Sequence, residues 1–157
     1  LSMREYFTAM EEAIREHGGL VLQFVGDELE AVFGVPLETS HHADNAVAAA
    51  LKMRRRLAEL NEKRTRAGKP PFQHGVGICS GPVLAGNTGS RHHPSYALIG
   101  DTVNKASRLQ ELTKKFDCDI LIGQKTRDLL QRGIATEAKE TTLISGTQET
   151  ISVYEVL

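Results

Sequence analysis

GGLVLQFVGDELEAVFGVP, residues 18–36, is the stretch that indicates the fold of this chain most directly. Two short apolar runs, at 20–25 and 29–33, flank a Gly-Asp-Glu sequence of the kind found in tight turns. The pattern predicts a β-hairpin with the carboxylate of Asp27 at its tip. Most Gly-Asp pairs in turns serve the turn alone, although a carboxylate in that position can also hold a cation.

Helices are predicted on both sides of this hairpin. Apolar residues recur at helical spacing before it, and Gly18-Gly19 is a typical helix end. A long helix is expected over residues 42–67, with the basic triplet at 54–56 facing water. Further helices are expected at 102–115 and 124–131, strands at 73–79, 82–86, 118–122, 140–144 and 150–156, and an irregular segment at 86–95. This mixture predicts an α+β fold, with a mostly antiparallel sheet and helices packed on one side.

Composition excludes several classes of protein. The chain has 157 residues, the length of one ordinary domain, with 40% hydrophobic and 25% charged residues. Its net charge of -1 argues against a nucleic-acid or membrane-surface binder, since no broad positive field exists. Two cysteines, in apolar stretches, are expected to be reduced. With no long apolar run and no signal peptide, we expect a cytoplasmic domain, either free or part of a membrane-anchored chain.

A polar motif opens the helix predicted from residue 102. Asp101 has the chemistry of an N-cap, and Gly100 before it frees the backbone for the entry turn. Asn104 and Arg108, four residues apart, share one helical face. An amide and a guanidinium there suit a ribose oxygen and a phosphate, but on these residues alone a polar face turned to water is the preferred interpretation.

The glycines at 75, 77, 81 and 86 indicate close packing of strands rather than chemistry. Glycine in a strand often marks a bend or the close approach of another backbone, so we expect these strands to pack closely against a partner. The segment is not a P-loop, because the lysine and hydroxyl of that motif are missing.

In this order and spacing, four stretches resemble the class III adenylate and guanylate cyclase catalytic domain. They are residues 18–36, HGVGICSGPVLAGNTGS at 74–90, YALIGDTVNKASRLQ at 96–110 and TISVYEV at 150–156. The resemblance covers residues 1–157 and implies a ferredoxin-like core, the nucleotide cyclase fold, lacking its first strand. It implies a head-to-tail homodimer with active sites in the interface, in a chain fused to an upstream sensor or regulatory region.

The implied reaction converts ATP or GTP to the 3′,5′-cyclic monophosphate and pyrophosphate, in intracellular signalling, with two divalent cations, Mg²⁺ or Mn²⁺. Asp27 matches the family's second metal-binding aspartate, with Phe24 and Gly26 beside it among the substrate-binding residues. Asn104 matches the residue that orients the ribose, and Arg108 the one that stabilises transition-state charge. Both are expected from the partner subunit.

The chain departs from the family pattern at several positions. No residue matches the first metal-binding aspartate, which we expect on a strand upstream of Leu1. The base-reading lysine falls on Gln23 and its acidic or threonine partner on Ala97, so the base preference stays open. The phosphate-binding lysine falls on Thr147, and nothing argues that nearby Lys139 replaces it.

Two hypotheses follow from these observations. The first is an active cyclase, favoured because the metal and transition-state positions are retained. The second is a degenerate cyclase homology domain that dimerises, or binds a nucleotide, as a regulatory module. A diguanylate cyclase ranks below both, since the turn lacks a doubled glycine and the VN-x-A-x-R helix does not belong there.

Overall fold

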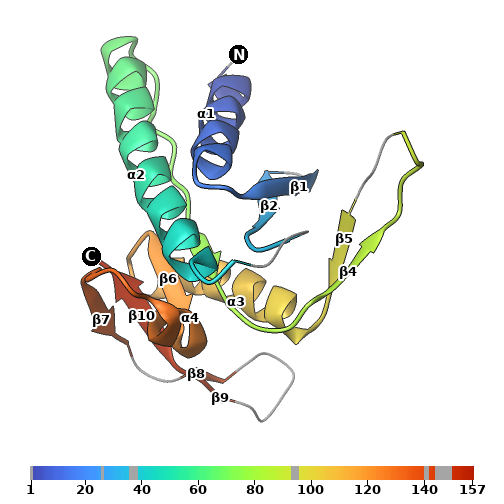
Figure 1. The fold of residues 1–157 in the computed structure, drawn as a ribbon. Coiled ribbons are helices and arrows are strands. Elements are labelled where there is room, and N and C mark those ends of the chain that lie inside the picture. Colours follow the sequence, from blue (N-terminus) through green and yellow to red (C-terminus); the bar gives the residue numbers. More distant parts are fainter. Residues whose placement is uncertain (1, 26, 36–38, 93–95, 140–141, 144–149) are drawn as a thin grey trace. The chain divides into compact units, whose positions relative to one another are not determined.

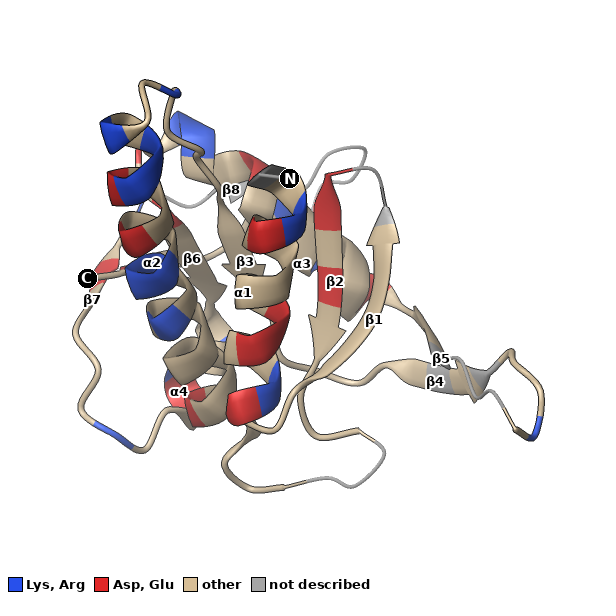
Figure 2. Ribbon diagram, turned by 90° about the horizontal axis from the view of Figure 1, so that it is seen from above, with Lys and Arg blue, Asp and Glu red and all other residues tan. Residues whose placement is uncertain are grey.

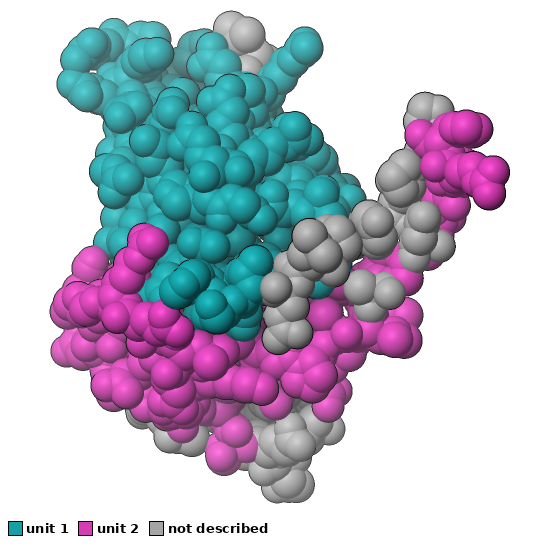
Figure 3. All heavy atoms as spheres, viewed as in Figure 1, with its two compact units in different colours: residues 1–74 teal, residues 75–157 magenta. Residues whose placement is uncertain are grey.

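The computed structural model describes residues 2–25, 27–35, 39–92, 96–139, 142–143 and 150–157. Its backbone forms two compact units, residues 1–74 and residues 75–157, coloured separately in Figure 3. In the described parts of the chain, no helix is both long and apolar enough to cross a bilayer.

The first unit consists of two helices and the predicted hairpin (Figure 1). In chain order these are α1 (Ser2–Glu16), β1 (Leu20–Val25), β2 (Glu28–Val32) and α2 (His42–Arg66). α1 packs against α2 and against β1, and β1 pairs with β2 antiparallel. The buried apolar residues of the two helices are Met10, Ala13, Ile14, Ala43, Ala46, Val47, Ala49, Ala50 and Leu57. The hairpin and the long helix predicted from sequence are therefore confirmed.

Basic residues are distributed along α2 (Figure 2). Arg55 is exposed, and Arg56 forms a 3.8 Å ion pair with Glu16 of α1. A half-exposed ion pair of this length adds little to stability. The prediction that the triplet faces water holds for Arg55, whereas Arg54 and Arg56 are half-buried.

The second unit is built on a four-stranded sheet in the order β3-β6-β10-β7. These strands are β3 (Val76–Ile78), β6 (Ile120–Gly123), β10 (Val153–Val156) and β7 (Thr136–Ala138). β3 and β6 are parallel, whereas β6–β10 and β10–β7 are antiparallel. Antiparallel two-stranded ribbons are formed by β4 (Leu84–Asn87) with β5 (Tyr96–Ile99), and by β8 (Thr142–Leu143) with β9 (Thr150–Ile151). Among the described residues the strand pairing is thus mostly antiparallel, as predicted.

Helix α3 (Asp101–Lys115) packs on β3 and β6, while the short α4 (Gln124–Leu129) contacts β6 and β10. The core between them contains Leu109, Leu112, Leu121, Ile151 and Val153, with Cys79 and Cys118 packed against it. Both cysteines are free, as expected. Burial raises the pKa of the Cys79 thiol to about 12, which keeps it protonated and unreactive.

Two strands, β5 and β7, were not predicted from the sequence, and one local prediction, the N-cap at Asp101, was wrong. β5 lies just after the segment taken as irregular, and it is a strand because it pairs residue by residue with β4. β7 has no apolar alternation, and it exists because β10 offers it a free edge. Asp101 is not the N-cap of α3: Gly100 is, at φ 141°, with no side-chain cap bond. Asp101 is instead the first helical residue, where its negative charge still complements the helix dipole.

The expected close packing of the glycine-rich strand is confirmed at Gly77. A Cβ built on Gly77 would overlap the carbonyl oxygen of Ala106 and the amide nitrogen of Gln110, and would lie 2.9 Å from Cβ of Leu109. The first two are backbone atoms of α3, which cannot move aside as a side chain can. The contact therefore requires glycine at this position.

Replacing Gly77 by alanine should lower the free energy of unfolding by about 2 kcal/mol or more, because strand and helix must separate to admit a methyl group. Gly133 is the matched control, since a Cβ there meets nothing within 4 Å and its φ is not positive. Urea titration of Gly77→Ala and Gly133→Ala measures the difference. Equal stability of the two variants would show that the close approach does not constrain the fold.

Candidate functional site

Asp27 lies at the tip of the hairpin, in the turn between β1 and β2. Its carboxylate is exposed, and the strands on either side are held in register up to the pair Val25–Glu28. Gly26 lies outside the described residues. The hairpin thus presents one carboxylate to solvent on a short, paired support, which is suitable for binding a cation.

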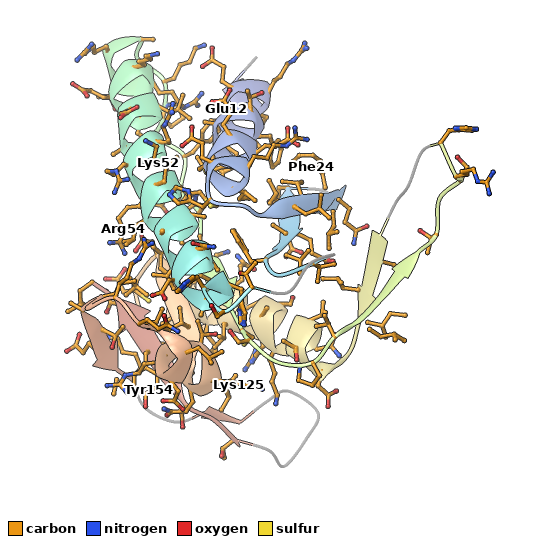
Figure 4. The ribbon with its side chains drawn as sticks, in the orientation of Figure 1. Glu12, Phe24, Lys52, Arg54, Lys125 and Tyr154 are labelled. Atoms are coloured by element: carbon orange, nitrogen blue, oxygen red, sulfur yellow. The ribbon has the colours of Figure 1, made fainter. Side chains whose placement is uncertain are left out.

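Gln23 and Phe24 precede this turn on β1 and, as neighbours in a strand, project to opposite faces. The Phe24 ring meets Phe7 of α1 edge to face, with ring centroids 5.0 Å apart, and 48% of Phe24 remains exposed (Figure 4). The amide nitrogen of Gln23 donates to a carboxylate oxygen of Glu30 on β2, at 3.4 Å. Sequence analysis missed Glu30, whose position opposite Gln23 follows only from the strand register.

Tyr6 of α1 is a second residue that sequence analysis missed. Its hydroxyl shares a 2.8 Å hydrogen bond with Nδ1 of His74. Burial, and then the negative charge of Asp27, raise the pKa of Tyr6 to about 12. Tyr6 is therefore close enough to the hairpin tip to be affected by its charge. The helical pattern could not predict this, because it places Tyr6 on one face of the helix but does not indicate which residues contact that face.

In the second unit, α3 carries Asn104 and Arg108 one turn apart. Asn104 is exposed, and a terminal nitrogen of Arg108 lies 3.4 Å from Glu111 on the same helix. The Nε atom of Arg108 is buried and has no hydrogen-bond partner among the described residues. A guanidinium with one long pair and one unsatisfied nitrogen retains capacity for an anionic ligand.

The remaining predicted residues give a mixed result. Ala97 lies in β5, opposite Gly86 of β4, and offers only a methyl group. Thr147 lies outside the described residues. Lys139 is held by Glu155 at 3.0 Å and Glu137 at 3.4 Å, and the hydrogen bond that Lys139 donates to Glu155 is the main reason the pKa of Lys139 is raised. A phosphate would have to compete with these two carboxylates for Lys139.

In the first unit, the hairpin brings together Gln23, Phe24 and Asp27. In the second unit, the β4–β5 ribbon carries Ala97, and α3 carries Asn104 and Arg108. Among the described residues, no three His, Cys, Asp or Glu side chains are grouped closely enough to hold a metal ion. Asp27 supplies one carboxylate, so a site for two cations needs ligands in addition to it.

A family model described as the adenylate and guanylate cyclase catalytic domain matches residues 2–156. The chain belongs to this family. Two solved structures share the fold of this cyclase domain. The guanylyl cyclase Cya2 has a TM-score of 0.87 at 28% identity, covering 99% of this chain and 78% of that chain. The adenylyl cyclase CyaB from P. aeruginosa has a TM-score of 0.87 at 27% identity, covering 99% and 80%. The predicted α+β nucleotide cyclase fold is thereby confirmed.

Curated relatives are much longer than this cyclase domain. Adenylate cyclase 1 of Rhizobium meliloti (strain 1021) is 29% identical over 155 residues, which are 99% of this chain and 23% of the relative. The adenylate cyclase of Anabaena cylindrica is 33% identical over 164 residues, 98% of this chain and 31% of the relative. The cyclase domain thus spans only a quarter to a third of these relatives.

The raised pKa of Tyr6 gives a prediction at high pH. The ordinary pKa of tyrosine is 10.0, so on raising the pH the unfolded chain loses this proton before the folded chain does. The stabilisation is complete below about pH 10 and is lost as the pH rises towards 12. Tyr6→Phe cannot ionise at this position, so its free energy of unfolding should lack this pH-dependent contribution.

The measurement is the free energy of unfolding of the parent and Tyr6→Phe from pH 8 to pH 11.5. The difference between them should shrink as the pH rises above 10. Tyr154→Phe in the second unit, whose hydroxyl donates to the exposed Gln124, serves as the control. A constant difference between the parent and Tyr6→Phe across the range would contradict the prediction.

Proposed function

We propose that this domain is an active nucleotide cyclase, converting ATP or GTP to the 3′,5′-cyclic monophosphate and pyrophosphate. The observation that carries the proposal is the state of Arg108. Its Nε is buried without a partner among the described residues, and Glu111 engages it only at 3.4 Å. An unsatisfied buried donor reduces stability, so its presence on α3 is best explained by an anionic ligand that completes its hydrogen bonds.

In this proposal, different residues of the chain bind the cations, orient the ribose and stabilise the transition state. Asp27 would hold divalent cations, Mg²⁺ or Mn²⁺, together with an aspartate from a strand preceding this stretch. When bound, such cations activate a hydroxyl and neutralise phosphate charge. The exposed amide of Asn104 would orient the ribose for attack of its 3′-oxygen on the α-phosphorus. Arg108 would stabilise the negative charge that develops there as pyrophosphate leaves.

A head-to-tail homodimer is part of this proposal, with the partner subunit supplying Asn104 and Arg108 to the Asp27 of the first. The β4–β5 ribbon supports it. Leu84 and Ile99 are directly paired across the ribbon and are 70% and 65% exposed. Two large apolar side chains side by side in water favour burial against a second chain.

We further propose that the domain is a single catalytic unit of a longer cytoplasmic or membrane-anchored chain with an upstream sensor or regulatory region, since its relatives are several times longer. No feature of the described residues favours nucleic acid as a partner. The alternative, a degenerate regulatory domain, is supported by the methyl group of Ala97 and by the carboxylates that occupy Lys139. Activity measurements separate the two.

Purified protein in its longest natural form should produce a cyclic nucleotide when supplied with Mg²⁺ or Mn²⁺ and either ATP or GTP. Asp27→Asn should lower kcat at least about 100-fold, because a neutral amide replaces the charged cation ligand at nearly the same size. Chromatography of the product measures both nucleotides. Asp128→Asn, on the exposed side of α4, is the matched control.

Absence of product from a folded dimer, with either nucleotide and either metal, would favour the regulatory alternative. Full activity of Asp27→Asn would show that this carboxylate does not hold the cations.

The shared active site gives a separate prediction. Asp27→Asn and Arg108→Ala should each be inactive, yet an equal mixture should recover about a quarter of the parent activity, because half of the randomly formed dimers contain one intact site. The assay is cyclic nucleotide formation before and after the two variants are mixed and allowed to exchange subunits. No recovery, with subunit exchange verified by tagged chains, would mean that each subunit supplies a complete site.

A further inference from the structure

The register of the hairpin contains an irregularity just before the base-reading position. Val21 pairs with Ala31, but Gln23 pairs with Glu30, so Leu22 is an extra residue on β1. Without this bulge, Leu22 would lie opposite Glu30, and Gln23 would lie opposite Leu29. Bulges commonly redirect a side chain next to an active site, and this one places an amide beside a carboxylate.

Gln23 and Glu30 therefore project on one face of the hairpin, because directly opposite residues of an antiparallel pair share a face. Phe24 marks the other face, where its ring meets Phe7 of α1. Figure 2 shows acidic positions on β2 and none on the described part of β1. Gln23 is exposed and Glu30 is half-buried, so both are accessible to a ligand.

The contact between them determines what they offer to that ligand. The amide nitrogen of Gln23 donates to Glu30 at 3.4 Å, and the amide oxygen of Gln23 takes no part in this hydrogen bond. Glu30, when ionised, has only acceptor oxygens, and one hydrogen bond leaves most of that capacity unused. The pair therefore presents adjacent acceptors, one of them charged.

We propose that Glu30 is a specificity-determining residue that, with Gln23, selects guanine. This inference rests on the proposed function and on the resemblance to the cyclase family, which puts Gln23 at the base-reading position. Guanine presents two neighbouring donors, N1–H and the N2 amino group, which match adjacent acceptors. Adenine presents only its N6 amino group next to the acceptor N1, whose lone pair would face an acceptor of the protein. A polar site that leaves such a pair unmatched discriminates strongly between substrates.

The test compares GTP and ATP on the longest natural form of the protein, with KM and kcat measured separately for each. The parent should favour GTP. Glu30→Gln keeps the size of the side chain but removes its charge, so the ratio of kcat/KM for GTP to that for ATP should fall about tenfold or more, mainly through a higher KM for GTP. Glu59→Gln, on the exposed part of α2, should leave the ratio unchanged.

A binding measurement keeps this inference separate from catalysis. A fluorescent GTP analogue bound to the protein with Ca²⁺ should be displaced by GTP at lower concentration than by ATP, and Glu30→Gln should reduce that difference. If the protein forms product but Glu30→Gln leaves the GTP-to-ATP ratio of kcat/KM unchanged, the inference is overturned. The cyclase proposal is then unaffected. Selective binding of GTP without any product overturns the cyclase proposal and leaves the role of Glu30 standing. Preference of the parent for ATP, or binding of neither nucleotide, overturns the inference.

Discussion

The close contact between Gly77 of β3 and the backbone of α3 fixes the position of the helix that carries Asn104 and Arg108. Carbonyl and amide groups of α3 lie where a side chain would otherwise project from the strand. The helix can therefore come close to the sheet, and Leu109 and Leu112 become buried against β6 and β10. With its apolar face fixed there, the helix leaves Asn104 exposed and places Arg108 half-buried at the border of that face. The placement of the proposed catalytic side chains is thus a consequence of backbone packing.

The hairpin shows a comparable dependence in the first unit. α1 supports it through the ring contact between Phe7 and Phe24, and a bulge at Leu22 decides which residue meets Glu30. On α3 of the second unit, Nε of Arg108 is buried and has no hydrogen-bond partner within the described part of the chain. Incomplete local satisfaction is common where a protein is organised to receive a ligand, since the ligand supplies the missing partners.

Much of the fold was predictable from sequence because strong local signals carried it. The hairpin, α2 and the interior strand β6 followed from apolar periodicity and turn residues. β5 and β7 did not, because both strands owe their existence to a pairing partner rather than to their own pattern. Asp101 was misassigned since sequence alone cannot show that Gly100 adopts φ 141° and takes the capping position itself. Asp27, Asn104 and Arg108 were identified by motif and spacing, whereas Tyr6 and Glu30 were not identified at all.

The sequence by itself therefore determined the family, the secondary structure of the strongly patterned segments and the residue types available for chemistry. These depend on periodicity and on motifs, which are local properties of a chain. Only the tertiary structure decided that Lys139 is held by two carboxylates, that Asp27 acts on Tyr6 and that Gln23 meets Glu30. Each of these interactions depends on strand register or on helix packing. Strand register cannot be predicted from composition or residue spacing, because a single bulge changes it.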